Sequence, residues 1–275
     1  MSNLSNQEQL IYWINERYNI YKAKERGEEA PWSDNPVMQE TYFCNVHREN
    51  DKVTKWIRDA FPLNHPHPEF NMLLARLVNK PESLEKMGFP FTQWGAEEQG
   101  SFLATMSCKG AWGSAYIVST NGRAMPKHDY IVELLTELFE PIKYIGSATT
   151  LAAAHKRLMR LRGLGSFMAA QIVADLKNTP KHNLVLASDW STWCAHGPGS
   201  LRGMAWTLGW EKVTPTEFQH SIPWLREYVD EELDYNRIPK FCNQDLQNCL
   251  CEMDKMMRVT KGTGRSKRKY NGRGL

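Results

Sequence analysis

Apolar residues recur along most of this chain at the spacing of amphipathic α-helices. The clearest helical patterns occupy residues 8–27, 69–80, 129–139, 148–160 and 243–258. Residues 112–127 differ, because β-branched residues there precede an Asn-Gly turn signal, and they are either a short β-hairpin or a loop. The pattern therefore predicts an all-α fold with at most one short β-hairpin.

Two glycines interrupt the helical pattern after residue 160. Gly163 and Gly165 surround Leu164, and glycine allows the positive φ angles of a tight turn. Ser166 is a candidate N-cap for a second helix. Helix, turn and helix would present backbone N–H groups at one tip, which suits a phosphate. An ordinary helical hairpin with a glycine corner explains the same residues equally well.

A single aspartate, Asp189, follows the apolar run at residues 184–187. The pattern L-x-G-x-G-x-x-x-A, an apolar segment and one Asp resembles the helix-hairpin-helix DNA glycosylase superfamily. The resemblance implies that Asp189 faces a flipped nucleotide. It assigns DNA-backbone contacts to Gly163, Leu164, Gly165, Ser166 and Phe167. Superfamily members with lyase activity carry a lysine where this chain has Phe167, which disfavours a Schiff-base mechanism.

The composition fits a globular body with a basic tail. The chain has 275 residues, of which 41% are hydrophobic, enough to fill a core. Residues 258–275 hold seven Lys and Arg residues and no acidic residue, although the whole chain has a net charge of only +3. We expect a body at 1–257 and a disordered tail at 258–275, in which Lys267 and Arg268 contact DNA phosphates.

Neither the cysteines nor the histidines form a metal-binding pattern. Cys242, Cys249 and Cys251 are too few, and wrongly spaced, for the iron–sulfur cluster of some glycosylases. His65 and His67 lie among prolines, which favours a loop over a metal site. We therefore expect free thiols, no metal ligands and no cofactor held by side chains. The N-terminus is polar and no apolar run is long enough for a membrane span, so we expect no membrane association.

A second and more specific pattern extends over most of the chain. It comprises PWSDNP at 31–36, FCNVHRENDKVTKWI at 43–57, AYIVSTNG at 115–122, GPGSLRG at 197–203 and DLQNCLCEMDKMMR at 245–258. These stretches resemble the phage amino acid:DNA transferases, also described as alpha-glutamyl/putrescinyl thymine pyrophosphorylases. Related helical domains occur in 5-hydroxymethyl-deoxyuridine DNA kinases. This sequence, however, has no G-x-x-x-x-G-K-[ST] phosphate loop.

This resemblance implies a glycosylase-like fold adapted to another reaction. Family members replace pyrophosphate on the 5-methylene of uracil in phage DNA with an amino acid, of which we favour glycine, or with a polyamine. The partners would be double-stranded DNA with a modified thymine and the amine donor. The target base would leave the stack, with Trp190, Trp193 or Tyr42 as stacking candidates.

The implied site has a catalytic and a substrate-binding part. Asp189 would act as the base for the incoming amine, and Arg48 and Arg202 would hold phosphates or the donor carboxylate. The candidate catalytic residues are Asp189, Arg48, Asn45 and Arg202. The candidate pyrophosphate and substrate contacts are Gly197, Gly199, Ser200, Arg202, His196, Asp34, Trp32 and Glu49. Ser200 is also a candidate helix cap, as are Ser33 and Asp34 for a helix near Pro36.

Two other functions stay open. One is a monofunctional glycosylase that excises a modified pyrimidine and leaves abasic sites, and the other is a kinase-associated or non-catalytic DNA-binding module. For all three we expect a two-lobed monomer in the host bacterial cytoplasm, with the helix-hairpin-helix at about 150–176. The N-terminal helix and the helix at 243–258 should pack in one lobe. A monovalent cation, bound by backbone carbonyls at the hairpin, is the one cofactor candidate.

Overall fold

The structure, a computed structural model, describes residues 4–62, 64–114 and 119–264. The helices in these ranges are α1 (Asn6–Glu25), α2 (Pro36–Glu40), η1 (Arg48–Asn50), α3 (Lys52–Ala60), α4 (Pro68–Val78), α5 (Pro81–Met87), α6 (Ala96–Met106), α7 (Lys127–Leu138), η2 (Pro141–Ser147), α8 (Leu151–Leu158), α9 (Ser166–Leu176), η3 (Asn183–Leu186), α10 (Pro198–Leu208), α11 (Pro215–Glu232) and α12 (Asn243–Thr260). The described ranges contain no β-strand, so the all-α prediction is confirmed.

The candidate β-hairpin at 112–127 is described only in part. Residues 115–118 lie outside the described residues, and the remainder of the segment contains no strand. The Asn-Gly turn signal itself is confirmed, because Asn121 and Gly122 both have positive φ angles, 53° and 78°.

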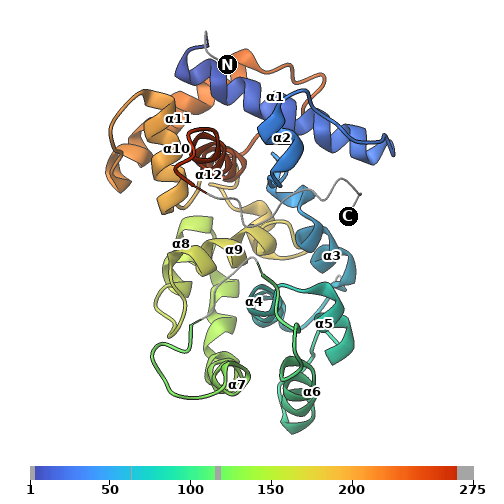
Figure 1. Cartoon of the computed structure of the whole chain (residues 1–275). Coiled ribbons are helices and arrows are strands. Elements are labelled where there is room, and N and C mark those ends of the chain that lie inside the picture. The colour runs from blue at the N-terminus through green and yellow to red at the C-terminus, as the bar shows by residue number, and fades with distance from the viewer. Residues whose placement is uncertain (1–3, 63, 115–118, 265–275) are drawn as a thin grey trace. The chain divides into compact units, whose positions relative to one another are not determined.

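The chain divides into two compact units. Unit 1 comprises Met1–Asn50 and Ser191–Leu275, and unit 2 comprises Asp51–Trp190. Unit 2 is therefore a continuous insertion between the two segments of unit 1 (Figure 1).

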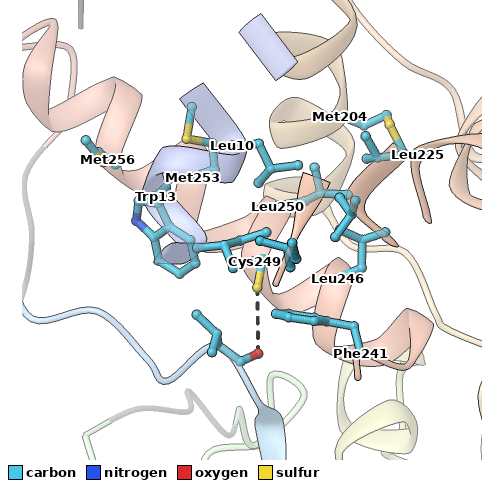
Figure 2. Close-up of a cluster of buried hydrophobic side chains, with 14 of the residues drawn as sticks. Leu10, Trp13, Met204, Leu225, Phe241, Leu246, Cys249, Leu250, Met253 and Met256 are labelled. Carbon is cyan, nitrogen blue, oxygen red and sulfur yellow. Dashed lines mark hydrogen bonds between the residues drawn. The ribbon is translucent and has the colours of Figure 1, made fainter. Parts of the chain in front are cut away.

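Unit 1 is built around α12, which packs against α1, α10 and α11. Figure 2 shows side chains of α1, including Leu10 and Trp13, beside Leu250 and Met253 of α12. The predicted packing of the first helix against the helix at 243–258 is thus confirmed. Helix α1 ends at Glu25, and Gly27 follows with a positive φ of 74°, as expected for a helix stop.

Helices α10 and α12 approach each other closely because Gly203 has no side chain. A Cβ atom at Gly203 would lie 1.9 Å from the Leu250 carbonyl oxygen, and one at Gly199 would lie 2.5 Å from the Cys251 Sγ. Because the Leu250 carbonyl is a backbone group, side-chain movement cannot relieve the clash at Gly203. Gly203 therefore has a packing role, whereas a Cβ at Gly197 would meet no atom within 4 Å.

Unit 2 is centred on α4, in which every residue from Glu69 to Val78 is buried. Helix α4 packs against α9, η2, α5 and α7. An ion pair joins α4 to α9: the Arg76 Nε and Nη2 atoms each lie 2.5 Å from an Asp175 carboxylate oxygen. The Nη2 atom also donates to Thr54 Oγ1 at 2.7 Å. Arg76 is fully buried, so this ion pair fixes the register of α4 against α9.

We predict that Gly203→Ala destabilises the protein by about 3 kcal/mol, since the added methyl group forces α10 away from α12. Urea unfolding followed by far-UV circular dichroism measures the change. Gly100→Ala in α6 is the matched control, because no atom lies within 4 Å of its added Cβ. That variant should be neutral or more stable by about 0.5–1 kcal/mol. Equal stability of the two variants would contradict the packing role of Gly203.

Candidate functional site

The turn between α8 and α9 is the predicted helical hairpin. Gly163 has a φ of 77°, and a Cβ there would lie 3.1 Å from Leu134 Cδ1. The N-cap of α9 is Gly165, so the prediction of Ser166 as N-cap is wrong. Ser166 is instead the first helical residue, and its Oγ lies 3.3 Å from His155 Nε2. The extended backbone of Gly165 takes the capping position one residue earlier.

The hairpin belongs to a basic part of unit 2. Residues 141–174 contain five Lys and Arg residues and no acidic residue. The basic residues are Lys143, Lys156, Arg157, Arg160 and Arg162. Helix α8 packs against α9 and η2, and η2 packs against η3. We call α8, the turn, the start of α9, η2 and η3 the hairpin surface.

Large apolar side chains are exposed on the same elements. The exposed fraction is 58% for Phe167, 65% for Tyr144 and 89% for Leu186. The Arg157 guanidinium lies 4.4 Å from the centroid of the Tyr144 ring. Cations interleaved with exposed aromatic side chains suit a nucleic acid, which offers both phosphates and bases. Phe167 was predicted for this surface, whereas Tyr144 and Leu186 have no motif in the sequence.

Asp189 binds the start of the hairpin. Its two carboxylate oxygens accept the N–H groups of Leu151 at 2.7 Å and Ala152 at 3.0 Å, in the first turn of α8. Thr150, the N-cap, accepts the N–H of Ala153 at 3.1 Å. Each Asp189 oxygen keeps a further lone pair, so the carboxylate can still accept a hydrogen bond.

The other predicted catalytic residues belong to unit 1. Arg17, which is buried, donates to the carbonyls of Phe43 and Cys44 and to the Asn45 side chain. The Asn45 Nδ2 donates to the Asn50 carbonyl at 2.7 Å. The Arg48 N–H donates to Asp245 Oδ1 at 2.7 Å. Asn45 and Arg48 thus lie on one loop, and much of its hydrogen-bonding capacity holds the loop in place.

The segment GPGSLRG begins α10, but its N-cap is Gly197 and not Ser200. Ser200 occupies the third helical position, and its Oγ accepts the Gly197 N–H at 2.9 Å. Ser200 is therefore not the N-cap, because Pro198 fits the first helical position and sets the helix start earlier, but its hydroxyl still caps the Gly197 N–H.

Arg202 lies on α10 and forms an ion pair with Asp254, which is fully buried. Its Nε lies 3.1 Å from both carboxylate oxygens and its Nη2 lies 2.8 Å from Oδ2. Arg258 Nε donates to Oδ2 of the same carboxylate at 3.1 Å. Hydrogen bonding to Asp254 raises the pKa of Arg202. Two guanidinium groups share one carboxylate, so a net positive charge remains beside α10.

The remaining predicted contacts of unit 1 have structural partners or are exposed. The Trp32 Nε1 donates to the Glu28 carbonyl at 2.7 Å, and the His196 ring lies 6.3 Å from that of Phe218. Asp34 and Glu49 are exposed. Asn35, and not Ser33 or Asp34, caps α2 through its side-chain oxygen.

The predicted basic tail is described only at its start. Lys267 and Arg268 lie outside the described residues. Helix α12 continues to Thr260, so the first residues of the expected disordered tail are helical. Among the residues described, no cluster of His, Cys, Asp and Glu side chains could hold a metal ion. None of the described helices is long and apolar enough to span a membrane.

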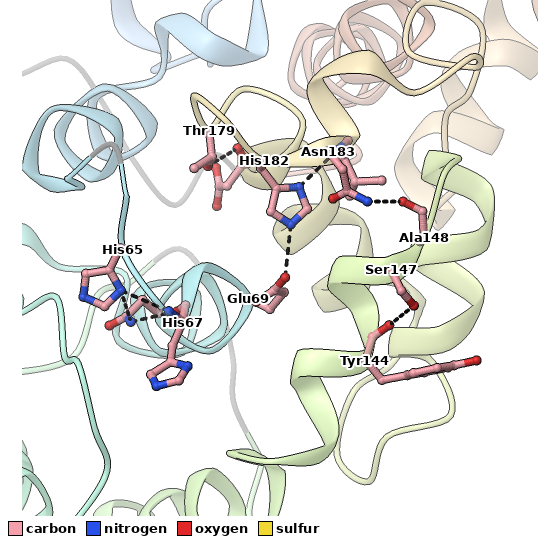
Figure 3. A network of polar contacts seen from close by, with 12 residues as sticks. His65, His67, Glu69, Tyr144, Ser147, Ala148, Thr179, His182 and Asn183 are labelled. Carbon is pink, nitrogen blue, oxygen red and sulfur yellow. Dashed lines mark hydrogen bonds and ion pairs between the residues drawn. The ribbon is translucent and has the colours of Figure 1, made fainter.

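Unit 2 also contains a polar cavity of about 490 Å³ that the sequence did not predict. Its walls include Glu69 and His182, which are hydrogen-bonded although they lie far apart in the chain (Figure 3). Neither residue belongs to a recognisable motif. The turn signals around Pro180 could have indicated only a loop.

The comparisons with known proteins agree with this helical architecture. Residues 5–266 match the family described as the helical domain of 5-hmdU DNA kinase, and the chain belongs to this family. A protein named 5-hmdU DNA kinase, from Bacillus phage SP10, is 24% identical over 227 residues. The match covers 72% of this chain but only 36% of that protein. The chain thus spans about a third of the relative's length. No solved structure matches.

We predict that Asp189→Ala destabilises the protein by about 1–2 kcal/mol, because two N–H groups of α8 lose their acceptors. Asp189→Asn should cost about half as much, since the amide retains one acceptor oxygen. Urea unfolding measures both variants. Wild-type stability of Asp189→Ala would contradict the role of this carboxylate at the start of α8.

Proposed function

We propose that this chain acts on modified thymine in phage DNA and replaces pyrophosphate on the 5-methylene carbon with an amine, an amino acid or a polyamine. The observation that carries the proposal is the family match over residues 5–266. The SP10 relative is named for a DNA kinase of 5-hydroxymethyl-deoxyuridine. A kinase converts the 5-hydroxymethyl group into a phosphate ester, which is a leaving group. A domain related to that enzyme is therefore suited to the same 5-substituted base.

The hairpin surface is the proposed DNA-binding element. Its cations would neutralise phosphates, and backbone N–H groups at the glycine turn would contact the same strand. Tyr144, Phe167 and Leu186 are exposed on this surface and would contact bases or sugars. Because most of these contacts are to the backbone, we expect binding to depend strongly on salt and weakly on sequence.

The proposed reaction breaks the C–O bond to pyrophosphate and forms a C–N bond. The oxygen leaves with the bonding electrons, and the uracil ring delocalises the positive charge that develops on the methylene carbon. The amine nitrogen supplies the new electron pair and loses one proton, which Asp189 accepts. In unit 1, Arg202 and the first turn of α10 are proposed as a separate anion-binding site. If the Asp189→Asn variant transfers the amine at the wild-type rate, Asp189 is not the base.

Mass spectrometry of nucleosides tests the function. DNA containing 5-pyrophosphomethyl-deoxyuridine is incubated with the protein and a mixture of amino acids and polyamines, and is then digested. We expect a new nucleoside that carries one amine, with release of pyrophosphate. Unchanged starting nucleoside would refute the transferase. Loss of the base with abasic sites left behind would instead identify a glycosylase.

A second candidate is a DNA-binding module that serves a kinase. The coverage favours it, because this chain matches only 36% of the SP10 kinase. Such a module would bind DNA without changing it. The nucleoside assay, run beside a DNA-binding assay, separates the two functions.

We predict that Arg160→Ala lowers DNA affinity and reduces the slope of log K against log salt by about one, as expected for one lost phosphate contact. Fluorescence anisotropy with labelled duplex DNA at several salt concentrations measures both quantities. Lys86→Ala is the matched control, because Lys86 is exposed on α5, outside the hairpin surface. Equal slopes for wild type and Arg160→Ala would contradict DNA binding by this surface.

A further inference from the structure

The polar cavity of unit 2 is lined by residues from α4, η2 and the segment after α9. Figure 3 shows Glu69, in the first turn of α4, beside His182. His65 lies in the loop that precedes α4. The full lining consists of Phe61, Asn64, His65, Pro68, Glu69, Gly146, Thr179, Pro180, Lys181, His182 and Asn183. Its volume, about 490 Å³, lies in the range of small-molecule sites, roughly 300–1,000 Å³.

Glu69 supplies a nearly buried carboxylate to the floor. The side chain is 8% exposed, and its Oε1 lies 3.2 Å from His182 Nε2. The His182 Nδ1 accepts the Leu184 N–H at 3.2 Å. The proton of a neutral imidazole therefore lies on Nε2 and is donated to Glu69. Within the described residues, the contact of the Glu69 carboxylate with His182 is made by Oε1, so Oε2 is the oxygen offered to a ligand.

The absence of a side chain at Gly146 leaves room for the Glu69 carboxylate. A Cβ atom at Gly146 would lie 2.4 Å from Glu69 Oε1. Any side chain at this position of η2 would push the carboxylate from its place beside His182. Burial, followed by the nearby His67 ring, lowers the pKa of His65 in the lining.

A basic side chain, that of Lys181, also lines the cavity at its exposed rim. Lys181 is exposed, and its Nζ lies 3.0 Å from Asn64 Oδ1. Its φ angle is 64°, a left-handed conformation that costs a lysine roughly 1 kcal/mol relative to its usual backbone. Glycine or asparagine would adopt this backbone more readily.

We propose that this cavity binds a zwitterionic amino acid, with its ammonium group on Glu69 and its carboxylate on Lys181. The assignment rests on the proposed function, because it identifies the cavity as the site of the amine donor. A carboxylate floor selects a primary ammonium, and a lysine on the rim repels the second ammonium of a diamine such as putrescine. The site therefore takes an amino acid in preference to a polyamine.

The position of the cavity in unit 2 agrees with this assignment. The Asn183 Nδ2 donates to the Ala148 carbonyl at 2.6 Å. Ala148 precedes by three residues Leu151, whose N–H binds Asp189. Three residues span at most about 11 Å. The rim and the carboxylate of Asp189 thus contact the same short segment, and a donor leaving the cavity has the proposed base close by.

Isothermal titration calorimetry of the full chain without DNA tests the site, with glycine, glutamate and putrescine as separate ligands. We expect glycine or glutamate to bind more tightly than putrescine. Glu69→Gln should weaken amino acid binding at least about tenfold, since it removes a charge-assisted hydrogen bond. Glu97→Gln, on the exposed side of α6, is the matched control and should bind like wild type.

A second variant separates ligand binding from folding. Lys181→Asn relieves the left-handed backbone, so its unfolding free energy should equal or exceed that of wild type while amino acid binding weakens. Wild-type affinity in both Glu69→Gln and Lys181→Asn, or tighter binding of putrescine than of the amino acids, would overturn the proposal. Absence of amino acid binding to the wild-type protein would overturn it as well.

The failure of this site and that of the proposed function give different results. If the nucleoside assay detects transfer and Glu69→Gln transfers at the wild-type rate, the cavity is not the donor site although the function holds. If amino acids bind in a Glu69-dependent manner but no DNA product forms, the transferase is refuted while amino acid binding by the cavity stands.

Discussion

The ion pair between Arg76 and Asp175 is the interaction on which the rest of unit 2 depends. It joins α4 to α9, and both candidate sites of unit 2 are built on these helices. Helix α4 carries Glu69 at its start, and α9 is the second helix of the hairpin and leads into the cavity rim at 179–183. A buried charge without its partner costs about 3–5 kcal/mol, so neither helix can shift without a large penalty.

Helical periodicity predicted several of the helices but missed α5, α6 and α11, and it did not predict the helix ends. The patterns at 8–27 and 243–258 correspond to α1 and α12, because one apolar face of each helix is buried in the core of unit 1. The caps were harder to predict. Ser166 and Ser200 both looked like N-caps, yet Gly165 and Gly197 cap the helices. A serine hydroxyl inside the first turn can find another partner, which is His155 for Ser166 and the Gly197 backbone for Ser200.

The site residues also differ in how far the sequence could predict them. The glycine turn and Asp189 could be singled out because local chemistry marks them, and the structure places both at the ends of α8. Glu69 and His182 could not be, because 113 residues separate them and neither has an unusual neighbour in the sequence. The structural partners of Asn45 could not be predicted from the sequence either. Its side chain binds Arg17 and Asn50, contacts that periodicity cannot reveal.

The insertion of unit 2 into unit 1 affects how the chain can fold during synthesis. Helix α1 leaves the ribosome before its packing partners α10 and α12, because the whole of unit 2 is synthesised between them. At about 5–20 residues per second, roughly ten seconds or more pass before those partners emerge. Leu10, Trp13 and Ile14, each fully buried in the finished protein, stay uncovered during that time. Unit 2 is continuous and can fold first, which leaves the apolar face of α1 as the aggregation hazard of the nascent chain.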